Sequence, residues 1–167
     1  MESIEPPDSH HLSAAIGWLE LGNWREANEE LENIAPVLRN HPTVLAVKYE
    51  VWAKAGKWDD AAEIARALIT VHPRDAQFWI WHAYATRRKA GGGIPQARAI
   101  LDQAQRLIPE EPLISYNLGC YECQLGNLPG ARFWLEKAFA SGDPKSFRSL
   151  ALADRDLEPL WAEISQM

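Results

Sequence analysis

The residues with the clearest chemical potential are two cysteines, Cys120 and Cys123, in a Cys-x-x-Cys arrangement. Such a pair can exchange thiols for disulfides or supply two of the four ligands of a structural zinc ion. A zinc site needs a second pair of ligands, and the chain has no further cysteine. The redox motif belongs where a strand meets a helix, whereas this pair lies inside a helical pattern. We therefore interpret both cysteines as small, buried or half-buried helix residues.

Other candidate motifs also fail to form a catalytic centre. The glycine-rich segment 90–95 lacks the Gly-Lys-Ser/Thr ending of a phosphate-binding loop, and the histidines form no His-Glu-x-x-His motif. We interpret Asp154 and Asp156 as the start of a helix, with Asp156 as the N-cap before Leu157. Because no acid, base and nucleophile converge, we expect a protein that is not an enzyme and that needs neither a metal nor another cofactor.

Composition narrows the classes of partner. The chain has 167 residues, 47% of them apolar, which is enough for a folded core. A net charge of −6 argues against nucleic acid, whose nonspecific binding needs many Lys and Arg residues. No apolar run is long enough to span a membrane. The acidic residues 1–11 lack the basic start and apolar run of a secretory signal, so we expect a cytoplasmic protein.

The elements that would position any site repeat along the chain. Ala27, Ala61, Ala97 and Ala131 are separated by 34, 36 and 34 residues. Three further columns keep the same register: a glycine five residues before each alanine, and mostly apolar residues four and seven residues after it (Gly22, Gly56, Gly92, Gly126; Leu31, Ala65, Leu101, Leu135; Ile34, Leu68, Ala104, Ala138). A period near 34 is typical of stacked helical hairpins.

Each column has a physical purpose. Glycine ends the first helix of a hairpin because it adopts positive φ without penalty, and alanine allows the second helix to approach the first closely. Prolines follow each second helix, where they cannot continue it (Pro42, Pro73, Pro109, Pro144). The pattern predicts first helices near 9–21, 43–55, 75–90 and 113–125. It predicts second helices near 23–39, 57–71, 95–107 and 128–140.

The columns resemble the tetratricopeptide repeat (TPR), a helix-turn-helix unit of 34 residues. The fourth repeat, from Tyr116 to Pro144, matches best, and the third carries two extra residues in the turn at Gly91–Gly93. The resemblance implies an all-α fold, a right-handed superhelical solenoid of about four hairpins. We expect an N-terminal tail at 1–8 and four repeats at 9–41, 42–74, 75–110 and 111–144.

Residues 145–167 are expected to form C-terminal capping helices. They carry apolar residues at helical spacing, including Phe147, Leu157, Leu160 and Ile164. The last hairpin of a solenoid has no neighbour to cover its apolar face, so a cap is required for solubility.

By the resemblance, the first helix of each hairpin lines a concave groove that holds a peptide. The residues expected to line this groove lie on the second, third and fourth of these helices: Glu50, Lys54, Trp81, Tyr84, Arg87, Arg88, Tyr116, Asn117 and Cys120. Aromatic rings and Arg are frequent anchors of interfaces. For Trp81, Tyr84 and Tyr116, packing against a neighbouring hairpin is the alternative. We assign the repeated Trp18, Trp24, Trp52 and Trp58 to the core.

Charge gives a second indication. The segment 74–109 has a net charge of +4, which leaves −10 on the remaining residues. This basic island could attract an acidic segment or a carboxylate, although cations in the last turn of a helix also favour its dipole. The TPR proteins that grip a C-terminal carboxylate use Lys, Asn and Arg at set inner positions. Only Asn117 fits that pattern here, and Leu12, Ile16 and Ala46 depart from it.

The sequence thus predicts a protein-protein interaction module that binds a peptide or protein segment, acidic or partly apolar, in its groove. The alternatives are a structural scaffold that self-associates into a homo-oligomer, and a small TPR chaperone for an apolar partner segment. The sequence leaves open the partner, the pathway and whether the aromatic residues of the third repeat face the groove or the core.

Overall fold

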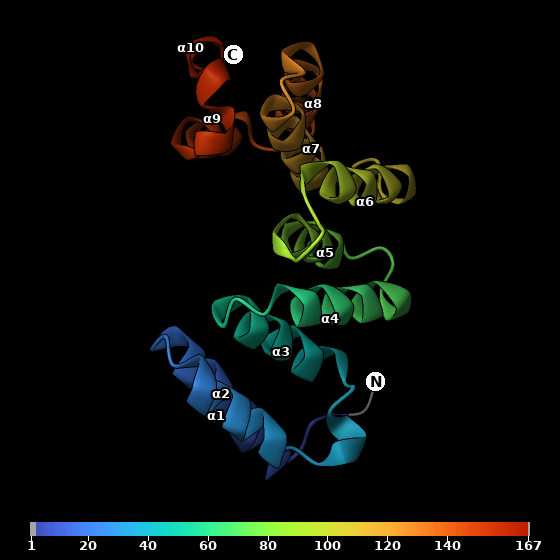
Figure 1. The fold of residues 1–167 in the computed structure, drawn as a ribbon, viewed down its shortest axis with the longest axis vertical. Helices are drawn as coiled ribbons and strands as arrows, with labels where there is room; N and C mark the ends of the chain where they lie inside the picture. The colour runs from blue at the N-terminus through green and yellow to red at the C-terminus, as the bar shows by residue number, and fades with distance from the viewer. Residues whose placement is uncertain (1–2, 167) are drawn as a thin grey trace.

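The computed structural model describes residues 3–166, which form ten α-helices and two 3₁₀-helices without any strand (Figure 1). No helix in this part of the chain is long and apolar enough to cross a membrane. The α-helices are α1 (Asp8–Glu20), α2 (Trp24–Asn33), α3 (Pro42–Lys54), α4 (Trp58–Val71), α5 (Ala76–Arg88), α6 (Ile94–Leu107), α7 (Pro112–Gln124), α8 (Leu128–Ser141), α9 (Pro144–Ala153) and α10 (Trp161–Ile164). The 3₁₀-helices are η1 (Pro36–Leu38) and η2 (Arg155–Leu160).

The first eight α-helices form four hairpins that stack in chain order. The members of each hairpin pack together, and the second helix of one hairpin packs against the first helix of the next. Figure 1 shows this stack rising along the long axis from α1 to α8, with α9 and α10 beside its last hairpin. The expected all-α superhelical solenoid is therefore confirmed.

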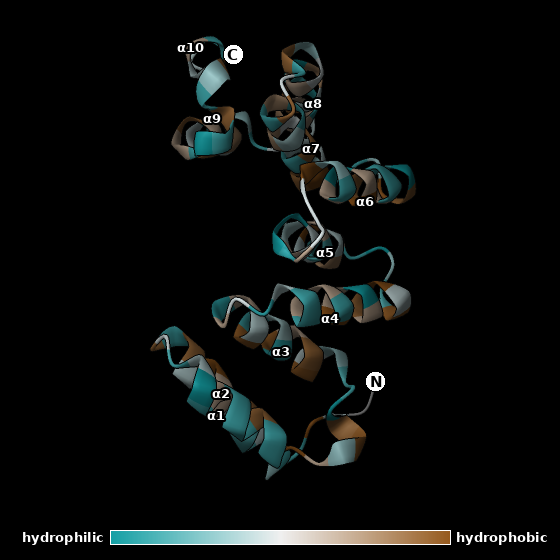
Figure 2. Ribbon diagram, viewed as in Figure 1, coloured by the Kyte–Doolittle hydropathy of each residue, from teal (hydrophilic) through white to brown (hydrophobic). Residues whose placement is uncertain are grey.

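The repeated alanines lie where the helices approach most closely. Ala27, Ala61, Ala97 and Ala131 are completely buried, as are the apolar residues that follow at helical spacing. Figure 2 shows hydrophobic and hydrophilic residues interspersed along the helices, with hydrophilic residues prominent where α1 and α2 are labelled. A side chain larger than alanine would push the paired helices apart, which explains the recurrence of this residue.

The third hairpin turn differs from the expected glycine column. Gly22, Gly56 and Gly126 have positive φ as expected, but Gly92 does not, and Gly91 takes the left-handed conformation instead. Gly92 is required for another reason: a Cβ built there would lie 1.9 Å from the carbonyl oxygen of Thr86. The two additional residues therefore shift the turn and fold it tightly against the end of α5.

Helix α2 ends earlier than the predicted range 23–39. It stops at Asn33, and η1 follows after a short extended stretch. Pro36 accounts for the difference, because the residue before a proline is driven out of the helical conformation, and Ala35 has ψ near 134°. The Asp8 carboxylate accepts a 2.6 Å hydrogen bond from the Ala35 amide and so ties this break to the start of α1.

The C-terminal segment packs against the last hairpin. Phe147, Leu157, Leu160 and Ile164 are buried in one cluster with residues of α7 and α8. The predicted helix start was wrong by two residues, since Asp154 rather than Asp156 caps η2: its carboxylate accepts a 2.9 Å hydrogen bond from the Asp156 amide. Asp156 is thereby left with a side chain that can engage another element.

Candidate binding groove

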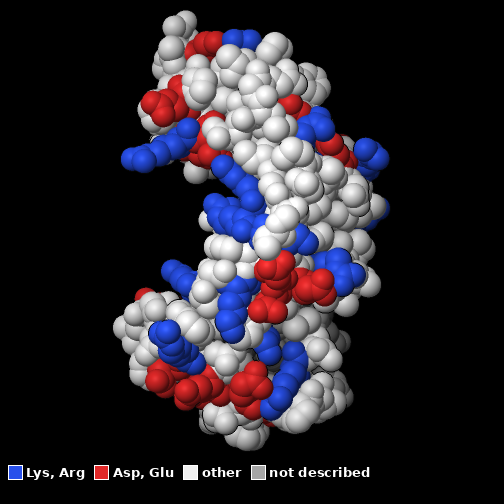
Figure 3. Space-filling view, viewed as in Figure 1, with Lys and Arg blue, Asp and Glu red and all other residues white. Residues whose placement is uncertain are grey.

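The first helices of the hairpins present equivalent positions along one side of the stack. Ile16, Glu50, Tyr84 and Cys120 follow one another at intervals of 34, 34 and 36 residues, on α1, α3, α5 and α7. Figure 3 shows a hollow at the left edge of the molecule, with Lys and Arg side chains gathered in it at the level of α5. Two clefts lie along this row, one between α1 and α3 and one between α5 and α7.

The N-terminal cleft, of about 410 Å³, has an apolar floor and charged edges. It is lined by Ile16, Leu19, Glu20, Val47, Glu50 and Lys54. Ile16 is 42% exposed, and Val47 and Leu19 are buried beside it. An apolar side chain of a guest could cover Ile16 here.

The C-terminal cleft is smaller, about 270 Å³, and more polar. It is lined by Tyr84, Arg87, Arg88, Asn117, Cys120, Tyr121, Asp154 and Asp156. The last two residues belong to the C-terminal segment, so the chain itself forms one wall of this cleft. Burial raises the pKa of the Tyr121 hydroxyl to about 12, which keeps it a neutral hydrogen-bonding group.

The nine residues predicted from the sequence are divided by the structure. Glu50 and Lys54 line the N-terminal cleft. Tyr84, Arg87, Arg88, Asn117 and Cys120 line the C-terminal cleft. Trp81 and Tyr116 line neither of them.

Trp81 joins the second hairpin to the third. Its ring stacks on Tyr49 of α3, with centroids 4.3 Å apart and an interplanar angle of 11°. The Tyr49 hydroxyl donates a 3.1 Å hydrogen bond to the Trp81 carbonyl. Trp79, two residues earlier, packs against a different cluster and donates its indole N–H to the carbonyl of Pro73. Both indoles therefore pack between elements, in opposite directions.

Tyr116 and Cys120 of α7 pack against the C-terminal segment. Both are buried, and the Tyr116 hydroxyl and the Cys120 thiol donate hydrogen bonds of 3.0 and 3.5 Å to the Asp154 carboxylate. Burial, with the Asp154 charge adding to it, raises the pKa of both groups. Cys123 is also buried, with its pKa raised by burial, and neither cysteine forms a disulfide. Such neutral thiols are poor nucleophiles.

The comparisons with known proteins address the fold directly. Residues 53–89 match the tetratricopeptide repeat family, a stretch that spans the end of α3, all of α4 and α5. Solved structures of TPR proteins superimpose on the stack over most of its length. The chain contains tetratricopeptide repeats and folds as a TPR solenoid.

Three solved structures illustrate this likeness. MamA from Desulfovibrio magneticus RS-1 has a TM-score of 0.68 and 18% identity, over 80% of this chain and 75% of its own. TTC0263, a thermophilic TPR protein of Thermus thermophilus, has a TM-score of 0.64 and 20% identity, over 96% of this chain and 100% of its own. PcrH, in complex with the chaperone-binding region of PopB, has a TM-score of 0.53 and 24% identity, over 80% and 97%. No curated protein sequence matches the chain.

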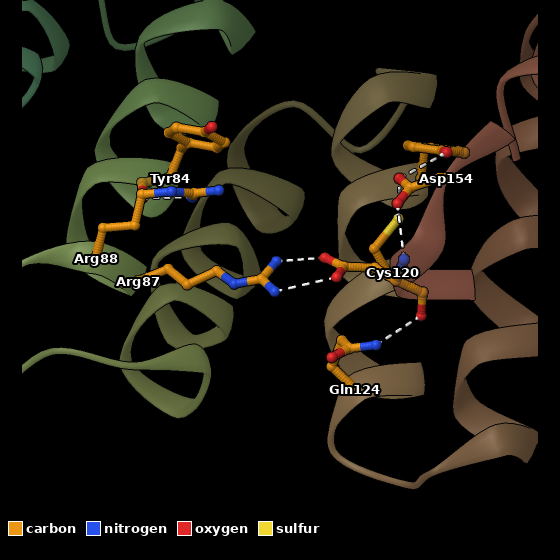
Figure 4. A network of polar contacts seen from close by, with 8 residues as sticks. Tyr84, Arg87, Arg88, Cys120, Gln124 and Asp154 are labelled. Carbon is orange, nitrogen blue, oxygen red and sulfur yellow. Dashed lines mark hydrogen bonds and ion pairs between the residues drawn. The ribbon is translucent and has the colours of Figure 1, made fainter. Parts of the chain in front are cut away.

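In this TPR solenoid the C-terminal segment reaches into the groove. Residues 154–156, which we call the acidic turn, face the third and fourth TPR hairpins. The Arg87 guanidinium binds both oxygens of the Asp156 carboxylate, and Gln124 donates a 2.9 Å hydrogen bond to the Asp156 carbonyl. Figure 4 shows Arg87 extended toward this turn. The hydrogen bond to Asp156 raises the pKa of Arg87 above its usual value.

The neighbouring Arg88 is held in a different way. Its guanidinium lies 3.4 Å from the centroid of the Tyr84 ring and donates a 3.2 Å hydrogen bond to the Tyr84 carbonyl (Figure 4). Trp58 meets the edge of the same tyrosine, with ring centroids 5.8 Å apart. Within residues 3–166 no carboxylate lies at ion-pair distance from Arg88. A stacked guanidinium keeps outward-facing N–H groups with which it can bind a carboxylate.

The rest of the basic island is partly neutralised outside the groove. Arg98 of α6 pairs with Asp102 at 2.9 Å and with Glu122, which is almost fully buried. The hydrogen bond to Glu122 raises the pKa of Arg98. The net charge of +4 predicted for this segment therefore overstates the free positive charge, and Arg88 is its cation on the groove side that lacks an acidic partner within residues 3–166.

Tyr121, Asp154 and Asp156 line the C-terminal cleft but were not among the residues predicted from the sequence, and the two aspartates have the larger effect on the site. The sequence analysis treated the two aspartates only as a helix start, because the contact of Asp156 with Arg87, 69 residues away, leaves no trace in local periodicity. The available signal was the pair of carboxylates in a segment expected to cap the hairpin beside the basic island. No group of three or more His, Cys, Asp or Glu residues suited to a metal ion occurs in the described part of the chain.

Proposed function

We propose that this TPR solenoid is a protein-interaction module that binds a segment of another polypeptide along α1, α3, α5 and α7. The observation that carries the proposal is the row of equivalent positions that opens into two clefts of different chemistry. The N-terminal cleft offers exposed aliphatic surface from Ile16, and the C-terminal cleft offers the Arg88 guanidinium. A guest with an apolar side chain and a carboxylate would fit both.

The solved neighbours support an interaction role of this kind. PcrH was solved with the chaperone-binding region of PopB, and TPR proteins in general bind other polypeptides rather than catalyse reactions. Trp81 and Tyr116 are left out of the proposed contact surface because they pack inside the protein. Glu50, Lys54, Tyr84, Arg88 and Asn117 stay in it.

Site-specific photo-crosslinking tests the proposal. A benzophenone amino acid replaces Ile16 in the groove, and in a matched variant it replaces Ala67, an exposed residue of the outer helix α4. After irradiation in an extract of the native host, we expect the Ile16 variant to form an adduct with a partner, identified by mass spectrometry. The Ala67 variant should not form that adduct.

Equal labelling from both positions would contradict binding in the groove. A self-associating scaffold, the second candidate, predicts adducts between copies of this chain instead. Light scattering over a concentration series checks that outcome, since only the scaffold requires a stable oligomer.

A further inference from the structure

We propose that the acidic turn is an internal competitor for the groove, and that an acidic guest segment gains Arg87 only by displacing the Asp156 carboxylate. The inference rests on the proposed function, because it concerns regulation of the same groove. It assigns a chemical class to the guest, a peptide with carboxylate side chains, and it assigns a second role to a segment expected only to cap the solenoid.

The first argument is the chemistry of the occupied position. The Arg87 guanidinium and the Asp156 carboxylate meet through two parallel contacts, the geometry in which Arg recognises carboxylates best. The two side chains are 23% and 26% exposed, so water and an incoming carboxylate can reach the pair. A partly exposed ion pair is weak enough to exchange partners.

The second argument is that the Asp156 carboxylate can release Arg87 while the C-terminal segment stays folded. Asp154 is held by Tyr116 and Cys120, and Leu157 is completely buried in the last core cluster. The Trp161 indole N–H donates to the carbonyls of Ala151 and Asp154 at 3.1 and 3.2 Å. These contacts fix the backbone of the turn on either side of Asp156. Release of Arg87 then needs only a rotation of the Asp156 side chain.

The third argument is the cation beside the pair. Arg88 follows Arg87 directly, lines the same cleft and has no acidic partner in residues 3–166. Lys54 occupies the equivalent position of the preceding hairpin, 34 residues earlier, and also forms no ion pair in this part of the chain. A guest carboxylate can therefore contact Lys54 or Arg88 first, and a second carboxylate can then compete for Arg87.

The competing explanation is that the Arg87–Asp156 pair only fastens the C-terminal segment. The two explanations differ in the effect of removing the Asp156 charge. A fastener would leave acidic peptides no better bound, whereas an internal competitor would release the site, because apparent affinity rises with the fraction of molecules in the open state.

The test is a fluorescence anisotropy titration with a fluorescein-labelled hexa-glutamate peptide, and with hexa-glutamine as the uncharged probe. The full chain is compared with D156N, which keeps the shape of the side chain and removes its charge. The matched control is E163Q, which removes one charge from the Arg132–Glu163 pair of the same segment, outside the cleft. We expect D156N to bind hexa-glutamate at least about fivefold more tightly, and E163Q to differ from the full chain by less than about twofold.

R88Q should weaken hexa-glutamate binding both alone and combined with D156N, and hexa-glutamine should not bind any variant. Unchanged or weaker binding of hexa-glutamate by D156N, or an equal gain in E163Q, would overturn the proposal. If D156N does not fold, the side-chain Nε–H signal of Arg87 in the unmodified protein replaces it, identified through R87K. That signal must shift when hexa-glutamate is added, and an unmoved signal overturns the proposal.

The result of this titration can be distinguished from the result of the crosslinking experiment that tests the proposed function. Crosslinking at Ile16 can succeed while D156N leaves hexa-glutamate binding unchanged, and then only the competitor role is lost. If Ile16 forms no partner adduct while D156N strengthens binding of hexa-glutamate, the competitor role stands and the partner contact must be sought elsewhere.

Discussion

The two ends of the groove, the open N-terminal cleft and the partly covered C-terminal cleft, are built from equivalent helices but differ in accessibility. Between α1 and α3 the wall is open, and an aliphatic side chain faces solvent with only charged residues at its margin. Between α5 and α7 the wall is covered in part by the chain's own acidic turn, which satisfies Arg87. The repeat therefore fixes where a groove lies, and residues outside the repeat decide how much of it is accessible.

The comparison also separates stability from recognition. Cys120 at the covered end belongs to the last core cluster together with residues of the C-terminal segment. At the open end Leu19 and Val47 belong to the first core cluster, whereas Ile16 and the charged residues beside it do not. Substitutions of buried core residues should cost folding free energy, and substitutions of exposed residues in the groove should affect mainly the guest. The following predictions test that division.

The largest effect is expected at Leu157. Leu157→Ala removes a completely buried side chain from the last core cluster and should lower the free energy of unfolding by about 2–5 kcal/mol. Ile16→Ala at the open end should change it by less than about 0.5 kcal/mol. Urea unfolding followed by far-ultraviolet circular dichroism measures both values. Similar losses of unfolding free energy for the two variants would contradict the distinction between buried core residues and exposed groove residues.

Trp81 lies on the border between the two ends, and its replacement should rank second. Trp81→Ala removes a half-buried ring from the stack on Tyr49, and we expect a loss near the lower end of the range for core aromatics, about 3 kcal/mol. Trp81→Phe keeps an aromatic face and should lose less. If the Trp81→Ala variant has the same melting temperature as the unmodified chain, Trp81 does not stabilise the fold and would again be a candidate groove residue.

A smaller effect is expected for Tyr116→Phe. It deletes the hydroxyl that donates to Asp154 and should cost about 1 kcal/mol. Tyr84→Phe, on the open face of α5, should be nearly neutral, since no hydrogen bond of its hydroxyl occurs in the described chain. Thermal melts of the two variants provide the measurement. Equal melting temperatures would show that Asp154 does not depend on Tyr116.

The smallest effect concerns pH. Burial lowers the pKa of His82 on α5 below its usual 6.5, with Lys89 and Arg66 adding to the shift and Glu63 opposing it. Below pH 6.5 the unfolded chain binds a proton that the folded chain resists, so stability should fall as the pH drops from 6.5 toward the folded pKa. His82→Gln should flatten the melting temperature in this window. An unchanged slope would place the pH dependence in other residues.

The fold could be predicted from the sequence because the residues that determine it lie close together along the chain. The alanine column sets helix contacts and the glycines end helices, so most helix bounds could be predicted to within a few residues. The early end of α2 was missed because the predicted range 23–39 did not take account of Pro36, which drives Ala35 out of the helical conformation. The shift from Gly92 to Gly91 was missed because the two extra residues leave several registers open.

The candidate site was readable only in part. Position on a first helix predicts that a residue is near the groove, and Glu50, Lys54, Tyr84 and Arg88 lie there. It does not predict whether another segment covers the residue. Tyr116 and Cys120 are buried because η2 returns over α7, and Trp81 turns to Tyr49 because a stacking partner is available on the preceding hairpin. Those contacts depend on three-dimensional closure rather than on spacing.

The separation of Arg87 and Asp156 by 69 residues also has a consequence during synthesis. A ribosome adds about 5–20 residues per second, so Arg87 exists for roughly 3–14 seconds before its carboxylate partner has been translated. Throughout that interval the nascent chain carries two adjacent guanidinium groups without the counterion that later covers one of them. If the acidic turn is the internal competitor proposed above, acidic polypeptides should bind the newborn chain more readily than the finished one.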